Sequence, residues 1–282
     1  MDKDKKIAIL TESSAIINRY IFDRSVVIAA HNEKQPFDHG TGMLLQLDEG
    51  VVVITAAHVI DKYKVEQLQI VSAEEPSNVR NAPTGKEFAR DKKSGGKDVA
   101  FLLLSDDGIR KLKNKKFLRL DDLEVFPQGL SEDLAMIFGM PETMHREQGI
   151  VHIYESFSYF SNIPADFDWK EAQKHPVQVV MEYPETVEDS FTRMFADLPE
   201  PFGMSGGGIW RARFKDAVVW TPERLRLIGI NTEFYRSKRT VKANRVEALL
   251  RLLAEDFGSA AEYLNRQEQL LKDAGIASRS EN

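Results

Sequence analysis

The stretch GTGMLLQLDEGVVVITAAHV, residues 40–59, joins two β-rich segments through a short turn. Gly42–Leu47 and Val51–Ala57 are dominated by apolar and β-branched side chains, which favour extended backbone. The residues Asp48-Glu49-Gly50 between them form a glycine-containing loop of the kind that closes a hairpin. The stretch therefore predicts a β-hairpin whose second strand leads directly to His58.

Short strand-like segments continue on both sides of this hairpin and are divided by Gly, Pro and Asp. They cover Ser25–Ala30, Gln67–Ser72, Val99–Leu104, Leu134–Phe138, Val151–Tyr154, Val177–Glu182, Gly207–Trp210, Val218–Trp220 and Leu225–Thr232. Many short strands separated by turns are typical of an all-β sandwich or a pair of barrels. The polar intervals 74–97 and 161–175 are predicted to be loops.

The two ends of the chain have helical patterns instead. Residues 7–22 predict a short amphipathic helix. Residues 244–257 place several leucines on a broad apolar face, and Gly258 is a typical helix stop. Ser259-Ala260-Ala261-Glu262 matches a capping box, which predicts a second helix as far as Ala274.

The bulk composition is that of an ordinary globular protein, with 42% hydrophobic and 29% charged residues in a chain of 282. That length permits one or two domains. The net charge of −6 gives no electrostatic reason to expect nucleic acid or an anionic membrane as a partner.

The sequence contains no cysteine, which fits a reducing compartment. The first six residues, MDKDKK, lack the apolar core of a signal peptide. The longest apolar runs are far shorter than the roughly 20 residues that cross a bilayer. We therefore expect a cytoplasmic protein.

Three stretches together carry the residue types that acyl transfer needs. Acyl transfer requires a nucleophile, a base that takes its proton, and a carboxylate that orients the base. His58 follows the small residues Thr55-Ala56-Ala57, and histidine side chains, whose ordinary pKa is about 6.5, can act as general bases. Asp98 stands at the start of an apolar strand, where we expect a buried carboxylate. Three other aspartates compete for this role but have more polar neighbours: Asp91, Asp106 and Asp107.

The third stretch, Phe202-Gly203-Met204-Ser205-Gly206-Gly207-Gly208, supplies the nucleophile. Its glycines allow a tight turn and a close approach to substrate. We predict that Ser205 attacks, and that the amides of Gly203 and Ser205 form an oxyanion hole. The large apolar residues on both sides of the glycine run argue against a flexible linker.

Two other readings of the glycine run fail. The sequence Gly203–Gly207 matches the nucleophile elbow of α/β-hydrolases, but that fold needs its histidine after the serine. All six histidines precede Ser205. No lysine follows the glycines as a phosphate-binding loop requires. The histidines are scattered without ligand spacing and thiolates are absent, so we predict no metal and no cofactor.

These motifs resemble the trypsin/chymotrypsin family, particularly its disulfide-free bacterial members. The chain order His, Asp, Ser agrees with that family. So do four further features: Gly40-Thr41-Gly42 before the histidine strand, the stretch Thr55–His58, the segment Gly139-Met140-Pro141, and the strand Leu227–Ile230 after the nucleophile. The resemblance covers roughly residues 23–257.

The resemblance implies an all-β fold of two six-stranded antiparallel β-barrels, with the catalytic residues in the cleft between them. The expected divisions are an N-terminal helical extension at 1–22, a first barrel at 23–125, a second barrel at 126–241 with an insertion at 142–200, and C-terminal helices at 242–282. Contacts to substrate are expected from seven residues: Pro199, Glu200, Phe202, Asn231, Thr232, Glu233 and Phe234.

The sequence departs from secreted members of this family at two positions. Met204 stands where those members have an aspartate that pairs with a newly cut N-terminus, so activation of that kind is not expected. Pro199 stands at the base of the specificity pocket, where trypsin-like enzymes have an aspartate.

The leading hypothesis is an intracellular serine endopeptidase that acts on a protein or peptide substrate through an acyl-enzyme. A regulatory protein partner is a further expectation, because an unrestrained cytoplasmic peptidase would endanger its host. The alternative is a catalytically weak, protease-like module that binds peptides in its cleft without cutting them.

Overall fold

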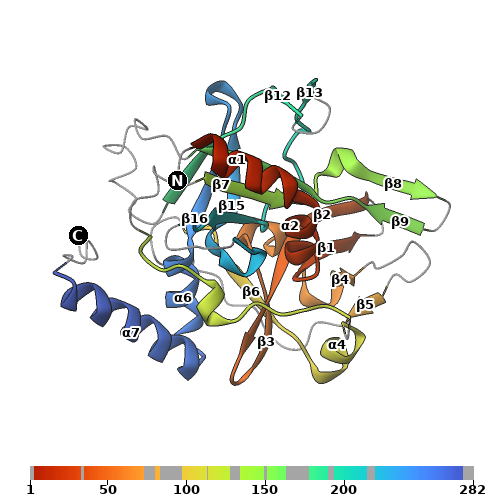
Figure 1. The fold of residues 1–282 in the computed structure, drawn as a ribbon. Coiled ribbons are helices and arrows are strands. Elements are labelled where there is room, and N and C mark those ends of the chain that lie inside the picture. The colour runs from red at the N-terminus through yellow and green to blue at the C-terminus, as the bar shows by residue number, and fades with distance from the viewer. Residues whose placement is uncertain are drawn as a thin grey trace.

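The predicted hairpin forms two neighbouring inner strands of the first of two large antiparallel sheets in the computed structural model (Figure 1). The structure describes residues 3–32, 35–72, 80–82, 97–112, 114–127, 134–148, 151–162, 178–189, 194–214 and 220–275. The first sheet contains β1 (Ser25–Asn32), β2 (Gln35–Leu47), β3 (Gly50–Thr55), β4 (Leu68–Ser72), β5 (Arg80–Ala82) and β6 (Ala100–Leu103). Its strand order is β5-β4-β1-β2-β3-β6.

The second sheet also has six described strands. They are β7 (Leu134–Gly139), β10 (Phe157–Asn162), β11 (Gln178–Glu182), β14 (Gly208–Ala212), β15 (Leu225–Tyr235) and β16 (Thr240–Arg245), in the order β10-β7-β14-β15-β16-β11. Both sheets are curled and all their pairings are antiparallel, which confirms the predicted two-barrel fold class. Two small hairpins accompany this sheet: β8 (His145–Gln148) with β9 (Val151–Tyr154), and β12 (Thr186–Glu188) with β13 (Phe195–Asp197).

The central strands are continuously apolar because both of their faces are buried. Val51 and Val53 of β3 pack inside the first sheet, whereas Val52 and Ile54 point into the large core that joins the two sheets and the terminal helices. In β7, Ile137 likewise lies in a separate core inside the second sheet. A strand with one wet face would instead alternate between apolar and polar residues.

Helices form near both ends of the chain, as predicted, but their number and their capping residues differ from the prediction. The N-terminal helix is two helices, α1 (Lys3–Glu12) and α2 (Ser14–Phe22), and α2 packs Ile17 and Ile21 into the core. The break falls at Ser13 and Ser14, whose hydroxyl groups compete for backbone hydrogen bonds and so weaken a helix interior. Two short helices lie in the first half of the fold, α3 (Ala57–Ile60) and α4 (Asp106–Lys111).

At the C-terminus, α6 (Val246–Leu253) is followed by α7 (Gly258–Asp273), which lies on the outside of the molecule in Figure 1. The predicted capping box at Ser259 is wrong. The N-cap residue is Phe257, and the hydroxyl of Ser259 bonds instead to Oε2 of Glu49, in the turn of the predicted hairpin. An exposed carboxylate from another part of the fold has replaced the local cap.

Several predicted divisions differ from the observed elements. The stretch 142–200, expected as an insertion, supplies two strands of the second sheet, β10 and β11. The expected loop from residue 161 overlaps the end of β10, a strand whose serines interrupt its apolar pattern, and the rest of that interval lies outside the described residues. β16 runs past the expected boundary at 241. The predicted strand at 218–220 falls mostly outside the described residues, and Trp220 is not in a strand.

Candidate active site

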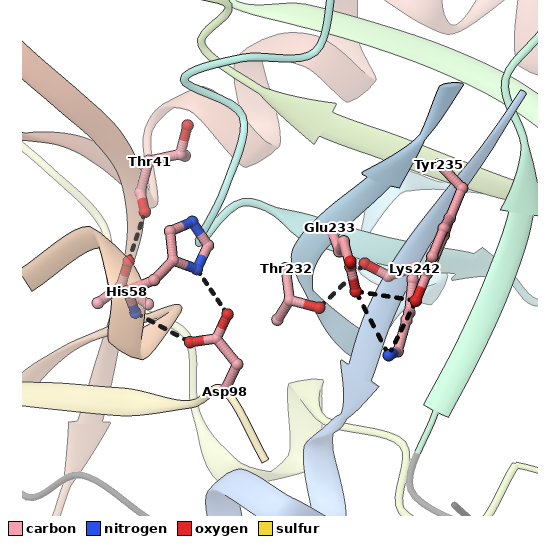
Figure 2. Close-up of polar contacts among 8 residues, drawn as sticks. Thr41, His58, Asp98, Thr232, Glu233, Tyr235 and Lys242 are labelled. Carbon is pink, nitrogen blue, oxygen red and sulfur yellow. Dashed lines mark hydrogen bonds and ion pairs between the residues drawn. The ribbon is translucent and has the colours of Figure 1, made fainter. Parts of the chain in front are cut away.

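His58 lies in α3, directly after the second strand of the hairpin. Its backbone N–H donates to Oδ1 of Asp98 at 2.9 Å, and its ring Nδ1 lies 2.5 Å from Oδ2 of the same carboxylate (Figure 2). Because one carboxylate binds both the backbone and the ring, the orientation of the imidazole is fixed. The carboxylate favours the tautomer with the proton on Nδ1, which leaves Nε2 as a proton acceptor.

Asp98 lies two residues before β6, and the pairing of β6 with β3 matches Ala100 with Thr55. This register brings Asp98 to the end of the sheet where His58 lies. Its side chain is 31% exposed, so the prediction of a buried carboxylate is wrong. The reason is a second hollow, which Asp98 and His58 share with polar residues of the second sheet: Gln178, Thr232, Glu233, Lys242 and Asn244. Figure 2 shows Thr232, Glu233 and Lys242 on the side of the second sheet, across from Asp98.

The loop that carries Ser205 has every carbonyl from Pro201 to Ser205 engaged as a hydrogen-bond acceptor. The Pro201 carbonyl accepts from the Met204 N–H at 3.1 Å, the Phe202 carbonyl from the Glu142 N–H at 2.7 Å, and the Gly203 carbonyl from the Thr41 hydroxyl at 3.0 Å. The Met204 carbonyl accepts from the Gly207 N–H at 3.0 Å, and the Ser205 carbonyl from the Thr41 N–H at 2.8 Å. By contrast, the N–H groups of Gly203 and Ser205 donate to no other group in the described part of the chain.

This pattern leaves two backbone donors available to a ligand. In a trans peptide the C=O and N–H groups point in opposite directions. Anchoring the carbonyls of Phe202 and Met204 therefore directs the N–H groups of Gly203 and Ser205 away from those anchors. Two such amides are the donors that an oxyanion hole requires.

Glycine is required at two positions of this loop. Gly203 and Gly206 have φ values of 85° and 84°, which L side chains rarely adopt. A Cβ atom on Gly206 would lie 2.0 Å from the carbonyl oxygen of Thr41 and 2.1 Å from Oγ1 of Thr55. Gly206 thus allows the nucleophile loop to pack directly against the sheet from which His58 extends.

Ser205 and His58 line the same cleft, of about 370 Å³, between the two sheets. Among the described residues, no hydrogen bond joins the imidazole to the Ser205 hydroxyl. Catalytic hydrogen bonds are often long before substrate binds and tighten in the complex. The structure therefore brings His58 together with Asp98 through hydrogen bonds, and with Ser205 through a shared cleft.

Five of the seven residues predicted to contact substrate line this cleft, namely Phe202, Asn231, Thr232, Glu233 and Phe234. The described lining does not include Pro199 or Glu200. The carbonyl of Pro199 accepts a hydrogen bond from the Tyr183 hydroxyl, and Glu200 pairs with Arg236 at 3.3 Å. Pro201 lines the cleft in their place.

Met204 anchors the loop from inside the second sheet. Its side chain is only 1% exposed and packs in that core, and its Sδ lies 4.0 Å from the Tyr183 hydroxyl. Burial raises the pKa of Tyr183, so this hydroxyl remains a neutral donor at physiological pH. An apolar anchor thus occupies the position at which the resemblance to secreted trypsin-like enzymes would place a charged one.

Sequence reasoning missed three residues that surround the nucleophile loop. In the sequence Thr41 is only the middle residue of a Gly-Thr-Gly motif, although its hydroxyl and N–H both bind the loop. His39 lines the cleft and its Nε2 lies 3.2 Å from the carbonyl of Met140. Glu142 contributes its backbone N–H to the loop and also lines the cleft. A polar residue between two glycines was the available signal for Thr41.

Neither a metal-binding cluster nor a membrane-spanning helix occurs in the described ranges. No three His, Asp or Glu side chains there gather closely enough to bind a metal ion. None of the helices in those ranges is both long and apolar enough to span a bilayer.

Comparisons with known proteins find similarity in structure but not in sequence. No protein-family model matches the sequence, and no curated protein matches it. A serine endoprotease from Yersinia pestis aligns at 14% identity and a TM-score of 0.49, over 85% of this chain and 64% of the other. HL collagenase aligns at 16% identity and 0.48, over 83% and 93% of the two chains.

The protease of tobacco vein mottling virus aligns at 11% identity and a TM-score of 0.40, over 81% of this chain and 79% of its own. This chain thus spans less than two thirds of the Yersinia pestis protein, and its identity to all three is low. The strand order of its two sheets, with a cleft between them, is that of the chymotrypsin-like two-barrel fold.

Proposed function

We propose that this chain is a serine endopeptidase in which His58, Asp98 and Ser205 form the catalytic triad. The observation that carries the proposal is one cleft lined both by an imidazole, oriented by a carboxylate at 2.5 Å, and by a serine whose loop has two amides that donate to no other described group. A base, a nucleophile and oxyanion donors in one cleft are the requirements for acyl transfer.

In the first half of the reaction, Oγ of Ser205 attacks the carbonyl carbon of the scissile peptide bond. The proton of Oγ passes to Nε2 of His58, and the carbonyl oxygen becomes an oxyanion bound by the amides of Gly203 and Ser205. The C–N bond then breaks as His58 returns that proton to the leaving amine. The acyl group remains on Ser205 as an ester.

In the second half, a water molecule gives a proton to His58 and attacks the ester carbon. The bond to Oγ breaks, His58 returns the proton to Ser205, and the carboxylic acid product leaves. Throughout, Asp98 keeps the proton on Nδ1 and stabilises the imidazolium that forms transiently.

The geometry of β15 supports binding of an extended peptide. β15 pairs with β16 along residues 229–235, whereas its pairing with β14 ends at Ile230. On that second side, residues 232–234 line the cleft instead of meeting another described strand. A substrate segment can therefore add to this edge through backbone hydrogen bonds. This arrangement suits cleavage within unfolded or extended segments of proteins.

The test is cleavage of a protein substrate such as casein by the wild-type chain and by Ser205→Ala. Removal of a triad member lowers the rate by roughly 10⁴- to 10⁶-fold. Ser237→Ala serves as the control, because it removes another serine hydroxyl, outside the described lining of the cleft, and should leave the rate unchanged. Retained cleavage in Ser205→Ala would refute the assignment.

A peptide-binding module without hydrolytic activity is the second candidate. The missing hydrogen bond between the described side chains of His58 and Ser205, and the partial exposure of Asp98, favour it. Such a module would bind peptides equally well before and after Ser205→Ala and would leave them intact.

Control by a protein partner and residence in a reducing compartment remain predictions. The hairpin of β12 and β13 exposes the large apolar side chains of Met194 and Phe195. The purified chain alone should digest casein more slowly than it does with its partner. Full activity of the isolated chain would contradict such control.

A further inference from the structure

Thr41 contacts the nucleophile loop from the first sheet, through its hydroxyl and its backbone. The side chain is fully buried in β2, with 0% exposure. Its Oγ1 accepts a hydrogen bond from the Met140 N–H at 2.9 Å and donates one to the Gly203 carbonyl at 3.0 Å. Its backbone N–H donates to the Ser205 carbonyl at 2.8 Å. One residue thus binds two carbonyls of the loop.

Thr41 is itself held in place by its neighbour in the hairpin. The hydroxyl of Thr55 donates to the Thr41 carbonyl at 2.9 Å, and Thr55 is also fully buried. Every polar group of Thr41 therefore has a partner in the interior. Hydrogen bonds in such a closed buried network fix geometry more strongly than exposed ones.

The bond to Met140 connects Thr41 to the other support of the loop. The segment that follows β7 contains Met140 and Glu142, and the N–H of Glu142 anchors the Phe202 carbonyl. The Thr41 hydroxyl thus acts on both sides of Gly203. It binds the carbonyl of Gly203 directly. Through its bond to Met140, it also positions the segment whose Glu142 N–H binds the carbonyl of Phe202.

We propose that the hydroxyl of Thr41 is a positioning group that sets the direction of the Gly203 amide, and so preforms the oxyanion hole. The proposal rests on the proposed serine endopeptidase activity. The flexible φ of Gly203 would otherwise let its flanking peptides rotate, and an amide that rotates away no longer donates to the oxyanion.

The deciding comparison is Thr41→Val against Thr41→Ser. Valine keeps the shape of threonine but leaves the Met140 N–H and the Gly203 carbonyl without this partner, whereas serine keeps the hydroxyl. We expect Thr41→Val to lower kcat by about 10- to 100-fold, because the loss of an oxyanion donor costs on the order of 10²-fold or more. KM should stay within about threefold, and Thr41→Ser should retain most of the wild-type kcat.

Thr240→Val is the matched control for a change that merely disturbs a sheet. Thr240 is buried at 6% exposure, and its hydroxyl has no hydrogen-bond partner among the described residues. Its replacement by valine should leave kcat and KM unchanged. If Thr41→Val and Thr240→Val lower kcat equally, or if Thr41→Val and Thr41→Ser behave alike, the proposal is wrong.

Hydrogen exchange measured by mass spectrometry separates this proposal from the proposed activity. The Met140 amide loses its acceptor in Thr41→Val, so peptides that cover residues 138–142 should exchange faster in that variant than in Thr41→Ser. This result does not depend on catalysis. A wild-type chain without hydrolytic activity would overturn the proposed function, whereas unchanged exchange in Thr41→Val would overturn the role of Thr41.

Discussion

Replacement of Asp98 by asparagine tests the hydrogen-bond pair on which the base depends. Oδ1 of Asp98 accepts the backbone N–H of His58, and Oδ2 faces ring Nδ1 at 2.5 Å. In Asp98→Asn one oxygen remains and keeps the backbone bond. The NH₂ group then faces Nδ1, so Nδ1 becomes the acceptor and the ring proton moves to Nε2. An imidazole protonated at Nε2 cannot take the proton of Ser205.

The expected loss follows from this tautomer change. The equivalent substitution in a chymotrypsin-type triad lowers kcat about 10⁴-fold. Asp98 is 31% exposed, so water can compete for Nδ1, and we expect a decrease of about 10³- to 10⁴-fold here. The free energy of unfolding should change by less than about 1 kcal/mol, because partly exposed ion pairs contribute little. Inactivity would then not be caused by unfolding.

The assay is the initial rate of cleavage of a peptide substrate, with folding monitored by circular dichroism and urea unfolding. Asp106→Asn is the matched control, because it makes the same chemical change at an exposed position beyond the other end of β6. It should retain the full rate. If Asp98→Asn keeps more than a tenth of the wild-type kcat, the role assigned to the Asp98–His58 pair is wrong.

Two further predictions concern the C-terminal helices. The Glu247 side chain is only 3% exposed, and its Oε1 accepts hydrogen bonds from the Phe126 N–H and the Arg245 guanidinium. Glu247→Ala should therefore lower the free energy of unfolding, measured with urea, by about 2–4 kcal/mol. An unchanged unfolding midpoint would contradict this prediction. Hydrogen bonds from Ser259 lower the pKa of Glu49 from its ordinary value of 4.5. The ionised Glu49 side chain therefore stabilises the folded state above pH 4.5, and this stabilisation is lost as the pH falls through the lowered pKa. Glu49→Gln should therefore unfold more easily than the wild type by less than about 1 kcal/mol at pH 7, and this difference should shrink as the pH is lowered through the acid range; a difference that stays constant with falling pH would refute the linkage.

Most of the architecture could be predicted because it depends on local pattern. Both faces of β3 and β7 are buried, so their apolar runs are strong strand signals. In contrast, β10 contains Ser158 and Ser161 and has no such run. The Ser259 capping box failed because a carboxylate 210 positions away provides the actual partner, and no local pattern contains it.

The residue types of the site could be predicted from the sequence, but the residues that position them and the solvent exposure of Asp98 could not. The order His58, Asp98, Ser205 and the glycines around the serine were visible in the sequence. The hydrogen bonds of Thr41 to the nucleophile loop join residues about 160 positions apart, for example 162 positions to Gly203. The exposure of Asp98 depends on residues of the other sheet. Such features arise only when the two sheets pack together.

The most direct measurement of the central claim is the reaction of the folded chain with a fluorophosphonate probe, followed by mass spectrometric mapping of the modified residue. Only a serine activated by a neighbouring base reacts rapidly with such a probe. We predict one label per chain, located on Ser205 and abolished in His58→Ala. A folded wild-type chain that takes up no label, or that is labelled on a different serine, would contradict the account.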